Sequence, residues 1–268
     1  MEESSILNQD TKHLLIIGLS RSGTSLLQRL MNACPGVFIT YESIYMPFLE
    51  KNTRYDVHAY YYEILKQHKH LCLAMPDKIL SESVKPFSFD EKFDYFGDKV
   101  IYNTGRRFLK QLKRAVASNE VDKIIFLVRD PRARALSYSK WLKRRDQTYK
   151  HTIRPGSETQ DPLKQLAEQC RLWNRYVEDV LAYSEASAKC MFLKYEDLVK
   201  SPQAGIENIL RFLELDPTIY PYNGLERVSP DSIKKWAGEM NRDALELINR
   251  LNRDYLEKFQ YMTAEQSV

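Results

Sequence analysis

The stretch from His13 to Met31 most constrains what this chain can fold into. An apolar run stops at Gly18, a short polar turn with a second glycine at Gly23 follows, and a periodic apolar pattern begins at Leu26. This order predicts a buried strand, a phosphate-binding loop and a helix. The amides of such a loop and of the first helical turn have no partner within the helix. Together with the helix dipole they favour a bound anion.

The residues of this loop argue against ordinary γ-phosphoryl chemistry. The spacing from Gly18 to Gly23 fits a nucleotide triphosphatase loop, but Thr24 stands where such an enzyme carries the lysine that reaches the β- and γ-phosphates. The positive charge comes earlier in the loop, at Arg21. We therefore expect the loop to hold an anionic group of a nucleotide.

Further short apolar segments alternate with helical patterns. The other expected strands are 37–40, 99–102, 123–128 and 190–193. The other expected helices are 133–145, 164–183, 203–213 and 243–260. This alternation predicts an α/β fold with a central parallel sheet flanked by helices. Because ligands on such sheets lie at the carboxyl ends of the strands, a cofactor is expected at the turns 18–25 and 129–132.

Length and composition predict a single domain over 1–268. The chain has 268 residues, of which 43% are hydrophobic, so it can bury a sizeable core. Its net charge of only +4 argues against a nucleic-acid partner. We expect residues 1–12 to be flexible. The polar stretch 143–163 is expected to form a mobile loop, with a plain surface excursion as the alternative.

The chain has four cysteines, which are scattered along the sequence. They lack metal-ligand spacing, and no metal site is expected. With no signal peptide and no apolar run long enough to cross a bilayer, the sequence predicts reduced thiols, a cytoplasmic location and no membrane anchor. The cysteines are Cys34, Cys72, Cys170 and Cys190.

Three separated motifs together resemble the sulfotransferases that use 3′-phosphoadenosine-5′-phosphosulfate (PAPS). They are GLSRSGTSLL at 18–27, IIFLVRDPRARALSYSKW at 124–141 and FLKYEDLVKSP at 192–202. The arginine in the first motif is most similar to that of the tyrosylprotein and carbohydrate branch. The resemblance spans about residues 13–260. It implies a P-loop-like sulfotransferase fold, PAPS as the sulfuryl donor, adenosine 3′,5′-bisphosphate (PAP) as the product, and no metal.

The resemblance assigns the 5′ end of PAPS to the first motif. Backbone and hydroxyl groups of Ser22, Gly23, Thr24 and Ser25 would cradle this end. Arg21 would lie against the bridging oxygen and the sulfuryl group, where it would stabilise the charge that develops on the departing phosphate. The alternative is that Arg21 is a surface residue on a generic turn.

The rest of the nucleotide is assigned to later residues. Arg129 and Ser137 match the 3′-phosphate pair of the family, a guanidinium fork and a hydroxyl well suited to phosphate. Tyr195 resembles the tyrosine that contacts adenine. Lys235 lies in SPDSIKKWAGEM, which resembles the segment that closes over the nucleotide. Each of these residues also has an alternative. Arg129 could form an ion pair at the start of a helix, and Ser137 could be an exposed helical serine. Tyr195 could be a core tyrosine, and the segment with Lys235 could be the exposed start of an amphipathic helix.

The two residues after Arg129 are expected to have a structural role. Asp130 and Pro131 are expected to begin the helix that follows.

The resemblance also suggests a base and reveals a departure. Glu42 matches the glutamate proposed as general base in the tyrosylprotein branch, with a structural carboxylate as the alternative and His58 as a reserve. Where that branch carries a catalytic lysine, this chain has Thr104. Arg106 or Arg107 could supply the missing charge.

The acceptor region between 44 and 98 is rich in aromatic and acidic residues. These would suit a compact cationic or polycyclic small molecule, and ordinary core packing explains them as well. We expect transfer to a hydroxyl, or less commonly an amine, of a small-molecule or natural-product acceptor. Two alternatives stay open: a P-loop kinase, and a non-catalytic nucleotide-binding protein of the same fold, which Thr104 favours.

Overall fold

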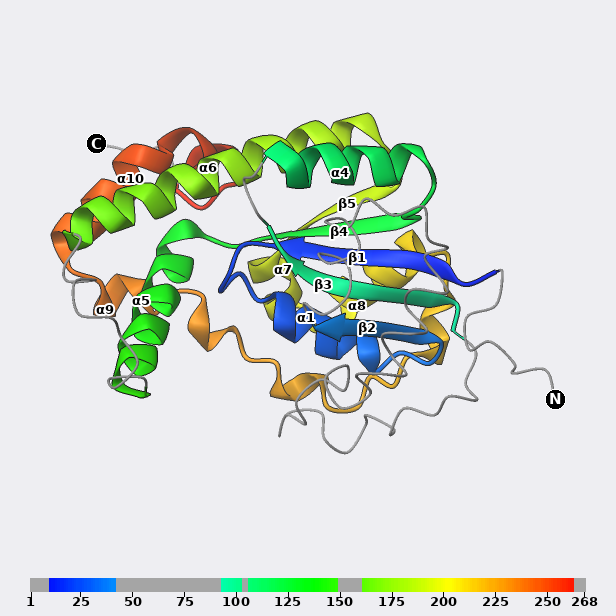
Figure 1. The fold of residues 1–268 in the computed structure, drawn as a ribbon. Helices are drawn as coiled ribbons and strands as arrows, with labels where there is room; N and C mark the ends of the chain where they lie inside the picture. The colour runs from blue at the N-terminus through cyan, green and yellow to red at the C-terminus, as the bar shows by residue number, and fades with distance from the viewer. Residues whose placement is uncertain (1–9, 42–92, 103–105, 149–160, 263–268) are drawn as a thin grey trace.

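A five-stranded parallel sheet forms the centre of the molecule (Figure 1). The computed structural model describes residues 10–41, 93–102, 106–148 and 161–262. The strands are β1 (Lys12–Gly18), β2 (Val37–Tyr41), β3 (Tyr95–Ile101), β4 (Lys123–Val128) and β5 (Cys190–Lys194). Their order is β2-β3-β1-β4-β5, and each neighbouring pair is parallel. The predicted α/β fold is confirmed.

Helices cover both faces of this sheet (Figure 1). The described helices are α1 (Thr24–Asn32), α4 (Arg106–Ala117), α5 (Pro131–Thr148), α6 (Pro162–Ala186), α7 (Tyr195–Lys200), α8 (Pro202–Phe212), α9 (Trp236–Glu239) and α10 (Arg242–Lys258). Short 3-10 turns lie at Pro217–Ile219, Leu225–Arg227 and Pro230–Ser232. Helices α1, α7 and α8 pack on one face and α4 and α6 on the other, with α10 alongside α6.

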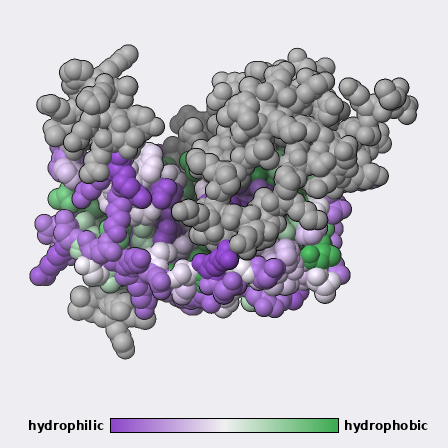
Figure 2. Space-filling view, turned by 90° about the horizontal axis from the view of Figure 1, so that it is seen from below, coloured by the Kyte–Doolittle hydropathy of each residue, from purple (hydrophilic) through white to green (hydrophobic). Residues whose placement is uncertain are grey.

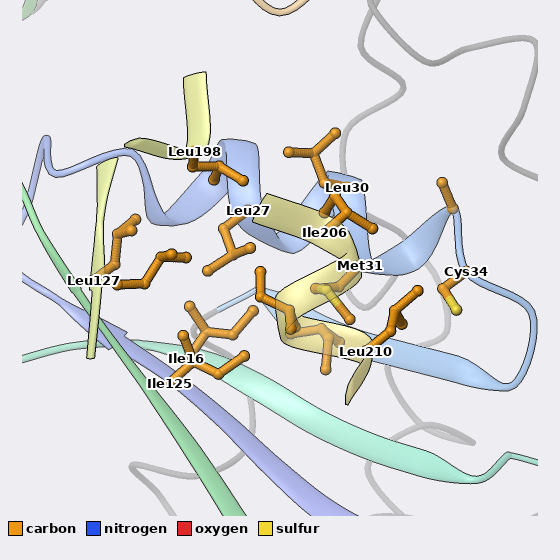
Figure 3. Close-up of a cluster of buried hydrophobic side chains, with 14 of the residues drawn as sticks. Ile16, Leu27, Leu30, Met31, Cys34, Ile125, Leu127, Leu198, Ile206 and Leu210 are labelled. Carbon is orange, nitrogen blue, oxygen red and sulfur yellow. The ribbon is translucent and has the colours of Figure 1, made fainter. Parts of the chain in front are cut away.

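The alternation of side chains along β1 supplies both layers of the core. Leu14 and Ile16 face α1, α7 and α8, whereas Leu15 and Ile17 face α4 and α6. Figure 3 shows the first layer, in which apolar side chains of α1 lie between the sheet and the helices that follow β5. Its labelled members are Ile16, Leu27, Leu30, Met31, Cys34, Ile125, Leu127, Leu198, Ile206 and Leu210.

Polar atoms of α6 fix the second layer to the sheet. The Tyr176 hydroxyl donates to the carbonyl oxygens of Ile17 (3.0 Å) and Leu127 (2.9 Å). The Trp173 indole donates to the Arg129 carbonyl (2.9 Å). These bonds anchor α6 at the ends of β1 and β4, the two strands from which the candidate site begins.

Regular structure extends into both segments that were expected to be flexible. Within 1–12, Thr11 is buried and donates to the Phe93 carbonyl (2.9 Å), and Lys12 begins β1. Within 143–163, α5 continues to Thr148 and α6 begins at Pro162. The sequence did not reveal the end of α5 because Lys143 and Arg144 are exposed and the stretch has no apolar periodicity. Residues 1–9 and 149–160 lie outside the described residues.

On the face shown in Figure 2, the described residues at the surface are mostly hydrophilic. Among the described residues, the exposed large hydrophobic side chains are Leu163 and Ile219. No helix in the described ranges is long and apolar enough to cross a membrane. Burial raises the pKa of the free Cys34 thiol to about 12 and that of the free Cys170 thiol to about 11, so both stay protonated at neutral pH.

Candidate functional site

Three chain segments emerge side by side at one edge of the sheet. Gly18, which ends β1, pairs with Leu127, and Val128, which ends β4, pairs with Lys194 at the end of β5. Because all three strands are parallel, the loop after Gly18, the residue after Val128 and the residue after Lys194 leave the sheet at the same edge. This edge is where the predicted motifs meet.

The loop after β1 is a tight turn with an unusual backbone. The Ser22 amide donates to the Leu19 carbonyl (3.1 Å), which closes a turn over residues 19–22. Arg21, the third residue of this turn, has a φ of 70°, in the left-handed region that non-glycine residues seldom adopt. A positive φ at the third position is the mark of a type II turn, which usually has glycine there.

The two glycines of the loop allow close packing. Gly23 has a φ of 96°, and a Cβ there would lie 2.3 Å from Cδ2 of Tyr195. A Cβ at Gly18 would lie 2.6 Å from Cγ2 of Thr24. Gly23 precedes α1, which has no side-chain cap among the described residues, so its first-turn amides keep their capacity to bind an anion.

Arg129 and Tyr195 form the centre of the site together with Ser232. The Arg129 guanidinium carbon lies 4.2 Å from the centre of the Tyr195 ring. Arg129 donates to the Arg21 carbonyl (3.2 Å), and to the Ser232 carbonyl (3.5 Å) and hydroxyl (3.4 Å). The hydroxyls of Tyr195 and Ser232 lie 3.2 Å apart. Four segments distant in sequence therefore meet around one guanidinium.

Arg21 joins the loop to α5. Its Nε donates to the Ser137 hydroxyl (3.3 Å), and the Arg21 side chain is exposed to solvent. Arg129 reaches the carbonyl of this same residue. Arg129 and Ser137, the predicted pair, thus both contact Arg21, one at its carbonyl and one at its side chain.

A second buried arginine supports the loop from α5. Arg134 donates through Nε to the Ser20 carbonyl (3.0 Å) and through Nη2 to Oε1 of Gln169 (2.7 Å). Only 2% of Arg134 is exposed, and burial lowers its pKa to about 10, so it stays charged at neutral pH.

Buried polar bonds fix the turn that carries Arg129. Pro131 is the first residue of α5, and Asp130 accepts from the Arg132 amide (2.8 Å) and pairs with the Arg132 guanidinium (2.8 Å). Glu196 accepts from the Asp130 amide (3.0 Å) and the Tyr261 hydroxyl (2.8 Å). The prediction that Asp130 and Pro131 begin a helix is confirmed.

Two buried donors in the site lack partners within the described part of the chain. They are Ser22 Oγ and Arg129 Nε. Leaving a buried polar atom without a partner is costly, so such atoms mark a place where a ligand or water belongs. Both atoms lie in the predicted phosphate-binding motifs.

The structure brings most of the predicted residues together, and it adds two. Ser22, Gly23, Thr24 and Ser25 lie on the loop and the first turn of α1. Lys235 is exposed at the start of α9, and no described contact joins it to Arg129. Ser232 and Arg134 were not predicted. Ser232 lies in the SPDSIKKWAGEM segment and Arg134 in the motif at 124–141, but the resemblance assigned no role to either residue.

Several predicted residues cannot be compared with the structure. Glu42, His58 and Thr104 lie outside the described residues. Arg106 and Arg107 begin α4, but only their backbone is described.

Comparison with known proteins agrees with this geometry. The model of the sulfotransferase family matches residues 14–218. A search of curated protein sequences gives no significant match. Among solved structures, mouse sulfotransferase SULT7A1 complexed with PAP has a TM-score of 0.55 at 13% identity, covering 95% of this chain and 86% of that one.

Two bacterial structures have similar scores. A sulfotransferase from Alicyclobacillus acidocaldarius has a TM-score of 0.54 at 16% identity, covering 95% of this chain and 97% of that one. The sulfotransferase domain of the Synechococcus PCC 7002 olefin synthase has a TM-score of 0.52 at 17% identity, covering 96% of this chain and 97% of that one. At these identities the likeness concerns the fold.

Proposed function

This chain belongs to the sulfotransferase family, and on that premise we propose that it transfers the sulfuryl group of PAPS to a small-molecule acceptor and releases PAP. The observation that carries the proposal is the buried guanidinium of Arg129. Its neighbours in the site are neutral oxygens at 3.2–3.5 Å. Within the described residues, no acidic side chain forms an ion pair with Arg129.

A buried cation without a counter-ion favours an anionic ligand. Arg129 is 7% exposed, and its Nε has no partner among the described residues. A phosphate would supply both the charge and the acceptor oxygens that this guanidinium lacks. We therefore assign the 3′-phosphate to Arg129 and Ser137, with Ser232 as a further contact. Tyr195, whose ring already packs against Arg129 and Gly23, would lie at the adenine side.

The loop after β1 suits the 5′ end of the donor. Bound PAPS supplies an activated sulfuryl group on a phosphate leaving group. The amides at the start of α1 and the hydroxyls of Ser22, Thr24 and Ser25 are proposed to hold the phosphate. Arg21, held near Ser137, is proposed to stabilise negative charge on the leaving group.

Glu42 is proposed as the base that takes the proton of the acceptor. It directly follows Tyr41, the last residue of β2. Because β2 is parallel to the other strands, the chain leaves it at the edge where the loop lies. This placement supports Glu42 over His58, which is sixteen residues further along the chain.

The acceptor is proposed to be a hydroxyl, or less commonly an amine, of a natural product or another small molecule. The shared fold with a sulfotransferase domain of an olefin synthase supports a biosynthetic role. We propose a cytoplasmic enzyme that acts without a metal or a nucleic-acid partner. Arg106 or Arg107 is proposed to supply the charge that Thr104 lacks.

Transfer of radiolabelled sulfur from PAPS to a panel of phenols, alcohols and amines tests this proposal. The wild type should label at least one acceptor class, and Glu42→Gln should lower the rate at least a hundredfold with little change in PAP affinity. PAP binding without label transfer to any acceptor would contradict the enzymatic role and favour the non-catalytic alternative.

A further inference from the structure

The turn over residues 19–22 is held in a conformation that its own residues disfavour. Arg21 has a φ of 70° at the third position, where a type II turn usually has glycine. With an arginine there, a type I turn with a φ of about −90° is the common choice. Something outside the turn must therefore stabilise the observed form.

The two turn types differ in the direction of the central peptide group. Between Ser20 and Arg21, the carbonyl and the amide point in opposite directions, and exchanging turn types turns the whole group over. In the observed form the Ser20 carbonyl faces Arg134 of α5. The Arg21 amide therefore points away from Arg134.

Two buried guanidiniums hold the peptide groups on both sides of the Arg21 Cα. Arg134 Nε binds the Ser20 carbonyl at 3.0 Å, and Arg129 Nη1 binds the Arg21 carbonyl at 3.2 Å. Gln169 on α6 accepts from Nη2 of Arg134 at 2.7 Å and anchors its guanidinium from the other side. The loop conformation is thus fixed by side chains from α5, from α6 and from the turn between β4 and α5.

We propose that Arg134 is a positioning residue of the donor site, which holds the Ser20–Arg21 peptide so that the loop binds an anion. The inference rests on the proposed function of this site. Without Arg134 the Ser20–Arg21 peptide group turns over. The Ser20 carbonyl oxygen then points away from α5, in the direction that the Arg21 amide has in the observed form. The Arg21 side chain also leaves the direction of Ser137.

Arginine suits this role better than lysine. Its planar fork donates from Nε and Nη2 in fixed directions, so one side chain binds Ser20 and Gln169 at once. The ammonium of lysine is a point donor on a flexible stem. Arg134→Lys should therefore keep the charge but lose much of the positioning.

A double-mutant cycle separates positioning from charge. PAP affinity is measured by calorimetry for the wild type, Arg134→Met, Arg21→Gly and the double variant. Glycine adopts a positive φ without strain, so the turn no longer needs Arg134 in the Arg21→Gly background. We expect Arg134→Met to lower PAP affinity at least tenfold in the wild-type background and less than threefold in the Arg21→Gly background.

Equal losses in both backgrounds would overturn the inference, because a purely electrostatic or general structural effect of Arg134 does not depend on residue 21. Binding of PAP by the wild type with no loss in Arg134→Met would overturn it too. Absence of PAP binding by the wild type would instead overturn the proposed function, and this inference with it.

Further variants guard against a folding defect and a general charge effect. If Arg134→Met does not fold, Gln169→Met replaces it, since this removes the anchor of the guanidinium but leaves the charge. Gln169→Met should lower PAP affinity less than Arg134→Met does, and this loss should also vanish in the Arg21→Gly background. A loss that persists in that background would contradict the positioning role. Arg171→Met, which removes an exposed charge on α6, should leave PAP affinity within twofold.

Discussion

The guanidinium of Arg129 lies over the ring of Tyr195, with 4.2 Å between the guanidinium carbon and the ring centre. The edge of this ring is also the surface that any side chain at Gly23 would strike. Three motifs that are far apart in sequence are therefore in direct contact. A substitution in any one of these motifs should therefore change the affinity of the whole site for the nucleotide.

Gly23→Ala tests the contact between the loop and Tyr195. The new Cβ would lie 2.3 Å from Cδ2 of the ring, and the φ of 96° is strained for alanine. We expect a loss of about 1–3 kcal/mol in the free energy of unfolding, measured by urea denaturation, and a large loss of PAP affinity. Gly238→Ala is the matched control because a Cβ there meets nothing within 4 Å. Similar losses for both variants would contradict this account.

Ser137→Ala tests the hydroxyl that faces Arg21. A hydrogen bond to a charged group contributes about 1.5–3 kcal/mol, so PAP should bind roughly ten- to a hundredfold more weakly. Ser139→Ala on the same helix is the control, because the Ser139 hydroxyl is exposed and donates to the Leu136 carbonyl. Unchanged affinity in Ser137→Ala would remove Ser137 from the proposed 3′-phosphate site.

Arg132→Met tests the buried ion pair that fixes the Arg129 turn. The side chains of Arg132 and Asp130 are 4% and 5% exposed, so removing the arginine leaves a buried carboxylate alone. We expect the free energy of unfolding to fall by about 3–5 kcal/mol. The exposed pair of Arg253 and Glu257 gives the comparison, and Arg253→Met should cost less than about 1 kcal/mol. Equal costs would show that burial does not govern these pairs.

Glu196→Gln tests the pH dependence of stability. Burial raises the pKa of Glu196 above its usual 4.5, although the Asp130 amide and the Tyr261 hydroxyl oppose the shift by donating to the carboxylate. A raised folded-state pKa means that the folded protein holds this proton more tightly. The stabilising effect is complete below the unfolded-state value and is lost as the pH rises through the raised value.

Glutamine does not titrate, so Glu196→Gln does not lose stability in this way as the pH rises. Relative to the wild type, Glu196→Gln should become more stable as the pH rises through the window that begins at 4.5. Urea denaturation of both proteins across that window measures the difference. A difference that stays constant, or that moves in favour of the wild type, would contradict the raised pKa.

The fold was largely predictable because its strands are short, apolar and buried. The prediction of β4 at 123–128 has the observed bounds, and the phosphate loop and its following helix were found from two glycines and an apolar period. The prediction of a loop over 143–163 missed the end of α5, because exposed residues such as Lys143 and Arg144 leave no apolar pattern in the sequence. Helices and strands were thus predicted where their buried faces require a run or a period of apolar residues.

The site was predictable where local motifs form it, but not where the fold assembles it. Arg21, Arg129 and Tyr195 were named from motifs, and the structure places them in one cluster. Ser232 stands in the segment expected to close over the nucleotide, but its contact with Arg129 depends on how the fold brings the two segments together. Arg134 acts on the carbonyl of Ser20, a contact that no one-dimensional pattern records.

Calorimetric titration with PAP, with ATP and magnesium as the comparison ligand, tests whether this site binds a sulfuryl donor. We expect micromolar binding of PAP, much weaker binding of magnesium ATP, and loss of PAP binding in Arg129→Ala. No binding of PAP, or a preference for magnesium ATP, would contradict the assignment of this site to a sulfuryl donor and favour the kinase alternative.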